Sequence, residues 1–236
     1  MRSLHLIAII CVFALLGACQ PSLQGGVAAP PQEVRKHAHA TIYTLDAERS
    51  TIVLKVYRDG PLARFGHNHA LAVTQLSGTL YREKDALQSD VELRFPAAAV
   101  AVDRPSDRAA AGPDFPGELP PEAIAGTRQN MLGPKLLAAV QYPDIQLRTL
   151  SVSGQWPELQ LLMEIRVREF TSQLTLPAHL SEADDALIAD GAATISQAQL
   201  GLTPYSVLGG GLRVRDGIDV QYHLVAVRNP PNANSH

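Results

Sequence analysis

The sequence predicts an all-β protein, built from antiparallel strands that form a barrel or a sandwich. Three observations support this fold class. Apolar and polar residues alternate with a period of two in several separate stretches, which is typical of strands with one buried and one solvated face. Turn signals rich in glycine, proline and aspartate separate these stretches. A single stretch shows the three-to-four spacing of an amphipathic helix.

The first residues of the chain have the order of a secretory signal. A basic residue at position 2 precedes an apolar run over residues 6–16, and small residues at 17 and 18 precede Cys19. The run is shorter than the ~20 residues that cross a bilayer, and the cleavage site resembles the bacterial lipobox. We therefore expect a lipoprotein signal peptide over residues 1–18 and a diacylated, palmitate-type anchor on Cys19. Ordinary secretory cleavage after Ala18 is the alternative.

This N-terminal signal predicts export to the periplasmic side of a bacterial membrane. Gln20 follows Cys19 in place of the aspartate that commonly retains such lipoproteins in the inner membrane, so we expect the outer membrane. Residues 19–39 are rich in proline, glycine and small residues and are expected to be a flexible tether. Residues 40–228 are expected to form one domain, and residues 229–236 a polar tail.

Composition excludes several classes of function. The net charge is −3 and no cluster of basic residues is present, so nucleic-acid binding is not expected. The chain has two cysteines, Cys11 and Cys19, and neither lies in the expected domain. The domain can therefore form no disulfide and no cysteine-based metal site. Serine nucleophile motifs and glycine-rich phosphate loops are also missing.

The expected strands and the expected helix follow in order along the domain. Alternation places on one face Ile52, Leu54 and Val56; then Val91, Leu93 and Phe95; then Leu159, Leu161, Met163, Ile165 and Val167; and finally Ile218, Val220, Tyr222 and Leu224. Residues 103–121 contain many prolines and alanines and are expected to be a long loop. One helical segment is expected over residues 127–140, divided at Gly133-Pro134.

The order of motifs resembles the YceI-like family of secreted bacterial proteins over about residues 40–228. The motifs are residues 43–50 leading into the strand at 52–56, a Gly-His loop, Leu76-Ser77-Gly78-Thr79-Leu80, residues 141–145, residues 170–177 and residues 196–204. The resemblance implies a single lipocalin-like antiparallel barrel of about eight strands with an apolar channel. It also implies binding of a long-chain amphiphile, such as an isoprenoid or quinone-type lipid, and no catalysis.

Two departures separate this chain from many members of that family. Residues 197–201 read Gln-Ala-Gln-Leu-Gly where many members carry Arg-Ser/Thr-Asp-Phe-Gly near the C-terminus. The sequence Gly66-His67-Asn68-His69 also marks a particular branch rather than the polyprenoid-binding members. The identity of the ligand therefore does not follow from the family resemblance.

His67 and His69 form the only polar group in the domain that suggests chemistry. In an extended chain they project to the same side as Leu71 and Val73, toward the interior of a barrel. Three interpretations stay open: contact with the polar end of a ligand, a metal site, or a local turn in which Gly66 and Asn68 adopt unusual backbone angles. A zinc-type site needs three or four ligands, and this pair supplies two.

The sequence thus predicts a lipid-anchored periplasmic protein that encloses an amphiphile in an apolar barrel and carries no certain cofactor. The expected ligand-binding residues are His67, His69, Ile52, Leu54, Val56, Leu71, Val73, Val91, Leu93 and Phe95. A metal- or cofactor-dependent enzyme that uses His67 and His69 is one alternative. A packed interaction module that binds no ligand is the other, and the oligomeric state stays open.

Overall fold

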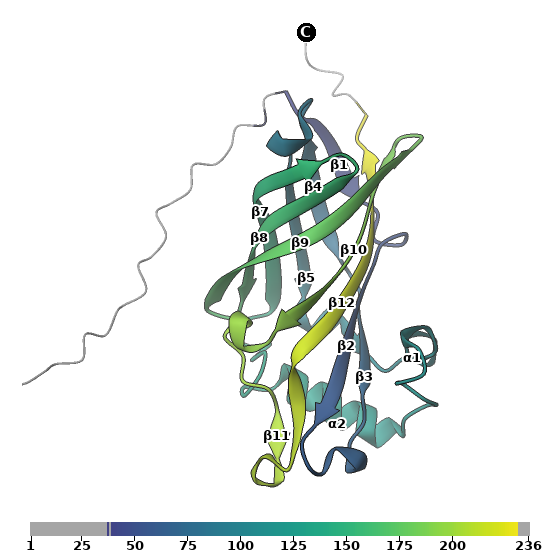
Figure 1. Ribbon diagram of the computed structural model, residues 1–236, viewed down its shortest axis with the longest axis vertical. Helices are drawn as coiled ribbons and strands as arrows, with labels where there is room; N and C mark the ends of the chain where they lie inside the picture. Colours follow the sequence, from purple (N-terminus) through teal and green to yellow (C-terminus); the bar gives the residue numbers. More distant parts are fainter. Residues whose placement is uncertain (1–36, 38, 231–236) are drawn as a thin grey trace, which may run out of the picture. The chain divides into compact units, whose positions relative to one another are not determined.

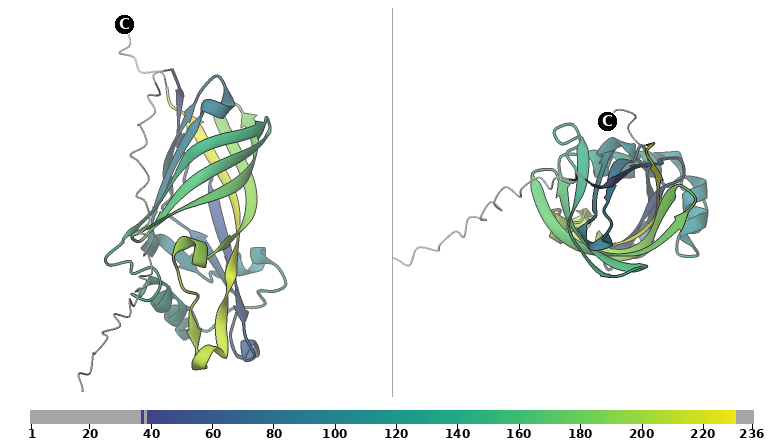
Figure 2. Two further views of the ribbon diagram at one scale, coloured as in Figure 1. Left: turned by 60° about the vertical axis from the view of Figure 1, so that its left-hand side comes forward. Right: turned by 90° about the horizontal axis from the view of Figure 1, so that it is seen from above.

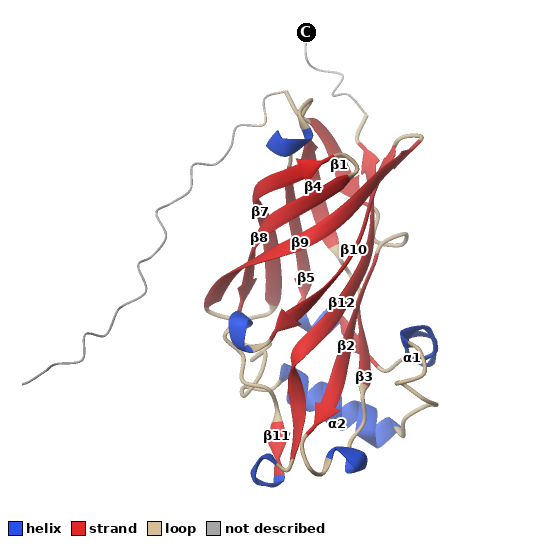
Figure 3. Cartoon of the chain, in the orientation of Figure 1, coloured by secondary structure: helices blue, strands red, loops and turns tan. Residues whose placement is uncertain are grey.

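Strands of one antiparallel sheet make up most of the structure, a computed structural model in which residues 37 and 39–230 are described (Figure 1, Figure 3). The strands are β1 (Thr41–Leu45), β2 (Thr51–Asp59), β3 (His69–Val73), β4 (Ser77–Arg82), β5 (Asp90–Pro96), β6 (Val100–Val102), β7 (Asp144–Gln155), β8 (Glu158–Val167), β9 (Phe170–Ala183), β10 (Ala186–Ser196), β11 (Ser206–Val207) and β12 (Leu212–Arg228). The helices are α1 (Pro105–Ala111) and α2 (Pro121–Leu132). The expected signal peptide (1–18), Cys19, most of the expected tether (19–39) and most of the tail (229–236) lie outside the described residues.

Eight of these strands close into a ring. Their order is β1-β4-β5-β7-β8-β9-β10-β12, and pairing of β12 with β1 completes the circle (Figure 2). All neighbouring strands in this ring are antiparallel. An eight-stranded antiparallel ring leaves an interior that can hold one small ligand. The predicted fold class, a lipocalin-like antiparallel barrel of about eight strands, is confirmed.

The last strand, β12, pairs with two different strands along its length. Near its C-terminal end, Ala226 to Arg228 pair with β1, whereas residues 213–223 pair with β2. β3 and β6 then continue the sheet outward from β2. The barrel therefore closes as a ring at one end and spreads at the other, where additional strands are added to the wall.

We call these the upper and the lower end, as they lie in Figure 1. The upper end contains the β7–β8 and β9–β10 hairpins. The lower end contains the β2–β3 connection, the β11–β12 hairpin and α2. The expected alternation is confirmed in each strand that we predicted, because the residues assigned to one face all line the interior of the barrel.

The helical segments differ from the prediction in two ways. α1 occupies part of the stretch 103–121 that was expected to be loop; Pro105 is tolerated because it stands in the first helical turn, and alanines follow it. α2 begins at Pro121 rather than at residue 127, again with proline in the first turn. It ends at Leu132, because Gly133-Pro134 cannot continue the helix, and turns follow instead.

α2 and the turns after it cover the spread part of the barrel wall. Met131 is buried against Val73, Phe95 and Val100, and Leu136 and Leu137 pack on the same cluster. The edge of β6 is covered too, because the Arg128 guanidinium donates hydrogen bonds to the carbonyls of Ala98 (2.7 Å) and Val100 (2.8 Å). Neither α1 nor α2 is both long and apolar enough to span a membrane.

Candidate functional site

A cavity of about 560 Å³ occupies the interior of the barrel. Its wall is made almost entirely of aliphatic and aromatic side chains from β2, β3, β5, β7, β8, β10 and β12, together with α2 and the turns after it. All ten residues predicted to bind a ligand border this cavity: Ile52, Leu54, Val56, His67, His69, Leu71, Val73, Val91, Leu93 and Phe95. Small-molecule sites have volumes of this order, about 300–1,000 Å³.

The inward side chains show that the interior is hollow. Ile52, Leu54 and Leu71 face the interior of the barrel, yet each keeps part of its accessible surface. In a filled core such residues would be fully buried, because protein interiors pack as densely as organic crystals. The packed interaction module is therefore not supported.

The cavity reaches solvent at the lower end. Among the described residues that border it, the exposed ones are Arg58, Phe65, His67, Asn130 and Arg213. All five belong to the loops, strand ends and helix of the lower end. Toward the upper end the bordering residues are either buried, as are Ser89, Asp90 and Leu187, or partly buried, as are Arg82, Ala86 and Leu180, and none of them is exposed. The barrel is therefore a cup with one mouth, which we define by those five exposed residues.

His67 and His69 lie at this mouth. Their rings are 6.4 Å apart between centroids and meet edge to face, at an interplanar angle of 68°. His69 is the first residue of β3 and is partly buried, whereas His67 is exposed. Both imidazoles border the cavity, as the extended-chain argument predicted. The structure thus combines an apolar cup with two polar rings at its rim.

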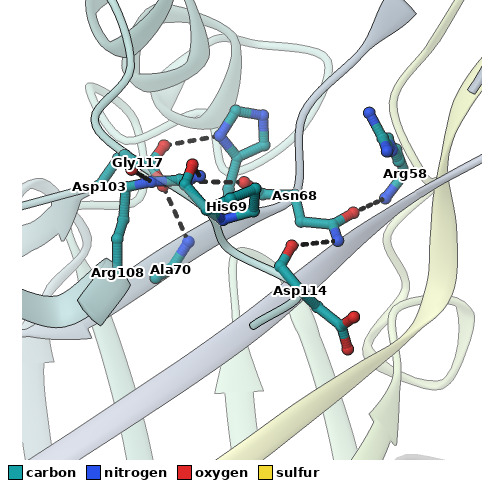
Figure 4. Close-up of polar contacts among 9 residues, drawn as sticks. Arg58, Asn68, His69, Ala70, Asp103, Arg108, Asp114 and Gly117 are labelled. Atoms are coloured by element: carbon teal, nitrogen blue, oxygen red, sulfur yellow. Dashed lines mark hydrogen bonds and ion pairs between the residues drawn. The ribbon is translucent and has the colours of Figure 1, made fainter. Parts of the chain in front are cut away.

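A buried carboxylate positions His69. The Nδ1 atom of His69 lies 2.6 Å from Oδ2 of Asp103, which is 1 % exposed (Figure 4). A carboxylate can only accept, so Nδ1 carries the hydrogen, and in the neutral ring Nε2 is left as an acceptor. The other oxygen of Asp103 accepts from the Ala70 amide (2.9 Å) and from Arg108 Nη1 (2.7 Å).

Arg108 completes the network from α1. It is 3 % exposed, and its guanidinium also donates to the backbone carbonyls of Asn68 (2.8 Å), Gly117 (2.8 Å) and Pro116 (3.2 Å). Every charge in the network therefore has a partner, which a buried ion pair requires. The segment that we expected to be loop supplies the cation that holds the site together.

These surroundings shift two pKa values. Burial by itself raises the pKa of Asp103, but the hydrogen bonds from His69, the Ala70 amide and Arg108 outweigh it and hold that pKa below its ordinary value. Burial lowers the pKa of His67, and the neighbouring His69 and Arg108 lower it further. His67 is therefore neutral at pH 7 and can donate or accept a hydrogen bond.

The turn at Gly66-His67-Asn68-His69 does not depend on the unusual backbone angles that were one interpretation of the sequence. Gly66 is extended (φ −107°, ψ −176°), and neither it nor Asn68 has a positive φ, so unusual backbone angles are not the reason for this motif. A Cβ at position 66 would lie 2.9 Å from Cδ1 of Leu212, so a larger residue in place of Gly66 would require the Leu212 side chain to shift. The Asn68 side chain accepts from the Arg58 amide (3.0 Å) and donates to the carbonyl of Asp114 (2.9 Å).

The metal interpretation lacks ligands. Within residues 37 and 39–230, no group of three or more His, Cys, Asp or Glu side chains is arranged to hold a metal ion. Asp103 is the only carboxylate bonded to either histidine of the motif in this part of the chain, and both of its oxygens are engaged.

Sequence reasoning missed Asp103 and Arg108. Asp103 lies 34 residues from His69 in the chain, and it follows a strand of three residues that carries little periodicity. Pairing of Leu71 with Val102 brings the two together. The available signal was a pair of opposite charges five residues apart, Asp103 and Arg108, in a segment with helix-favouring alanines.

Fold and site together define a lipocalin-like β-barrel with one open apolar cavity. A family model described as YceI-like domain matches residues 43–226. The chain belongs to the YceI-like family, as its motifs indicated; this barrel is a fold that binds hydrophobic ligands and is not known as an enzyme family. No curated protein matches the chain in sequence.

Solved structures share the fold at low identity. BcnA of Burkholderia cenocepacia has a TM-score of 0.59 at 12% identity, and the match covers 78% of this chain and 99% of that chain. A mutant CJ YCEI protein has a TM-score of 0.50 at 9% identity, covering 68% of this chain and 85% of that chain. The YCEI protein of Campylobacter jejuni has 10% identity and a TM-score of 0.48 over the same shares, 68% and 85%.

Proposed function

We propose that this protein binds a long-chain amphiphile, with the apolar tail in the cup and the polar end between His67 and His69. The observation that carries the proposal is the cavity of about 560 Å³ with an apolar wall and an imidazole pair at its single mouth. Burial of apolar surface contributes roughly 25 cal/mol per Å², so the tail supplies the affinity. Polar groups at the mouth set the orientation.

The chemistry of the rim indicates which head groups fit. Nε2 of His69 is an acceptor because Asp103 holds the hydrogen on Nδ1. His67 has no hydrogen-bond partner among the described residues and can take either role. A head group with a hydroxyl or N–H donor for His69, and a carbonyl or hydroxyl for His67, satisfies both rings. An isoprenoid alcohol meets this requirement through its hydroxyl, which can donate and accept. A quinone-type lipid meets it in its quinol form, whereas the oxidised quinone offers only carbonyls and can satisfy only His67.

The proposal includes a location. Cys19, carrying acyl chains, would tether the barrel to the periplasmic face of a bacterial membrane, most simply the outer membrane given Gln20. There the protein would hold, buffer or carry a lipid that water does not dissolve. What supports this part is the sequence of the N-terminal segment alone.

Native mass spectrometry of the purified protein, followed by solvent extraction, tests the binding proposal. We expect a mass excess that is recovered as an amphiphile. In Leu54→Trp the ring occupies the cavity, so bound lipid should fall while the unfolding midpoint changes little. The matched control is Lys55→Trp on the outer face of the same strand, which should retain its lipid. Absence of bound lipid, together with no uptake of an added isoprenoid alcohol, would contradict the proposal.

Metabolic labelling tests the anchor. Cys19→Ser should abolish incorporation of labelled palmitate and release the protein from the membrane fraction. Equal labelling of both chains would exclude Cys19 as the acylated residue. The cavity proposal is unaffected by either result, because Cys19 lies outside the barrel domain.

A further inference from the structure

The lower end of the barrel carries exposed apolar side chains beside the mouth. Phe65 is 64% exposed and Leu208 is 71% exposed, and among the large apolar side chains of the described residues only Val140 is more exposed. Phe65 ends the 3-10 turn η1 (Ala63–Phe65) in the β2–β3 connection, and Leu208 begins η5 (Leu208–Gly210) in the β11–β12 hairpin. Two separate loops therefore each present one large apolar side chain to solvent.

The two loops are joined to each other. The Leu62 amide donates to the carbonyl of Gly211 (2.8 Å). The place a Cβ would occupy on Gly60 lies 2.6 Å from the same carbonyl oxygen, so only glycine allows the loops to approach this closely. Phe65 and Leu208 thus belong to one surface. We call it the lower rim and define it by residues 58–68 and 206–215.

The lower rim is basic. Its charged residues are the four arginines Arg58, Arg64, Arg213 and Arg215, against the single carboxylate Asp59. Asp59 is paired with Arg213 at 2.8 Å, and Arg215 is paired with Asp219, just outside the rim, at 3.5 Å. Arg58 and Arg64 are exposed and form no ion pair with any described residue. The positive charge of the rim that no ion pair compensates therefore comes from Arg58 and Arg64. The guanidinium of Arg64 lies 4.5 Å above the ring of Phe65, so a cation accompanies the exposed aromatic side chain.

We propose that the lower rim docks on the surface of an anionic phospholipid bilayer. Apolar side chains flanked by arginines are typical of segments that lie at the membrane interface, where the rings enter the acyl boundary and the cations meet phosphates. The rim also contains the mouth: Phe65, His67, Arg58 and Arg213 border the cavity. A docked barrel would open directly into the bilayer, so that a tail need not cross water.

A single tryptophan provides a local reporter. The chain has one tryptophan, Trp156, in the β7–β8 hairpin at the upper end, where it lies under Arg82. We would place the reporter on the rim with Phe65→Trp in a Trp156→Phe background, and compare it with the parent chain. Both carry Cys19→Ser, so that no acyl chain at that position contributes.

Vesicles of phosphatidylglycerol and phosphatidylcholine in equal amounts should shift the emission of the rim tryptophan to shorter wavelength. In the parent chain the same vesicles should leave the emission of Trp156 unchanged. Pure phosphatidylcholine should give no shift, and ~1 M salt should reverse the shift by screening. Phe65→Ser with Leu208→Ser, or Arg58→Gln with Arg64→Gln, should weaken vesicle association roughly tenfold. Val140→Ser, at a fully exposed valine that does not border the cavity, is the matched control.

Three results would overturn the docking surface. The first is an equal emission shift with both kinds of vesicle, and the second is an equal emission shift for the tryptophans at both ends of the barrel. The third is a dimer, seen on sedimentation, that is lost when Phe65 and Leu208 are replaced, since that would identify a second copy as the partner. The docking surface and the proposed function fail separately. If the cavity is empty but the rim tryptophan emission shifts with anionic vesicles, only the ligand-binding proposal is refuted. If the cavity holds lipid but the emission does not shift, only the docking proposal is refuted.

Discussion

The two ends of the barrel are built from the same antiparallel sheet but are closed differently. At the upper end, β1 bridges β12 and β4, and Tyr43, Leu187 and Ala226 pack together with Leu80 into a small apolar cluster. At the lower end β2 takes the place of β1 beside β12, and the wall continues into β3 and β6. One end is sealed by local packing; the other stays open and is bordered by loops and α2.

The polar groups follow this division. The upper part of the cavity is bordered by buried and partly buried residues, among them the polar Ser89 and Asp90, whereas the lower end carries the imidazole pair, the buried Asp103–Arg108 pair and the exposed Phe65. A barrel end that is not sealed by its own strands needs other elements to hold it, and here a buried ion pair joins β3, the residue after β6, and α1. The open end is thus held by a buried ion pair, whereas β1 and the apolar cluster around Tyr43 close the upper end.

The largest expected effect is that of Asp103→Ala. It leaves the Arg108 guanidinium buried without its carboxylate, and loss of one partner from a buried pair costs about 3–5 kcal/mol. We expect the lower value, because Arg108 keeps three backbone carbonyls. Urea unfolding measures the change. Asp190→Ala, which removes an exposed partner of His223, should cost less than about 1 kcal/mol; equal effects at both sites would contradict the comparison.

The next effect concerns binding rather than stability. His67→Ala with His69→Ala should weaken amphiphile binding by about 1–3 kcal/mol, because polar atoms of the bound head group lose their partners. The unfolding midpoint of this variant should also fall, because His69→Ala leaves Oδ2 of the buried Asp103 without its partner. The single variant His67→Ala removes no hydrogen bond to a described residue and should keep the midpoint of the parent chain. Titration with an isoprenoid alcohol measures the affinity. A variant that binds normally but unfolds at lower temperature would assign the pair to the turn, and stoichiometric metal lost only in the variant would favour the enzyme alternative.

The same comparison explains which parts could be predicted from sequence. Strands such as β8 were recognisable because alternation from Leu159 to Val167 directly reflects one buried face. Through this rule eight apolar residues that border the cavity could be predicted to bind a ligand, whereas others, such as Leu136 and Leu187, could not. Asp103 and Arg108 were missed, because their roles depend on the register of Leu71 with Val102 and on α1, neither of which leaves a periodic pattern. Polar contacts across the sheet are long-range and specific to one register.

A smaller effect is expected from Arg128→Ala on α2. The guanidinium donates two hydrogen bonds to the exposed edge carbonyls of Ala98 and Val100, and their loss should cost about 1–2 kcal/mol. If the lower end depends on such polar contacts, hydrogen exchange should accelerate in β6 and α2 while β1 and β4 stay protected. Uniform acceleration over the whole barrel would show that the two ends unfold as one unit.

The smallest effect is a dependence of stability on pH. The folded-state pKa of His67 lies below its unfolded value of 6.5, so the unfolded chain binds a proton first and stability falls as pH drops below about 6.5. The pKa of Asp103 is also lowered, from 3.8, so its contribution persists above that pH and is lost only as pH falls through its folded pKa. His67→Gln should therefore remove the loss that begins near pH 6.5 and leave the acid limb set by Asp103. Urea midpoints of both chains, measured from pH 8 to pH 3, test this. The two curves should run parallel above pH 7 and diverge below it, with the midpoint of the parent chain falling first. A parent curve that stays flat to pH 4 would show that the His67 ring at the mouth is not desolvated.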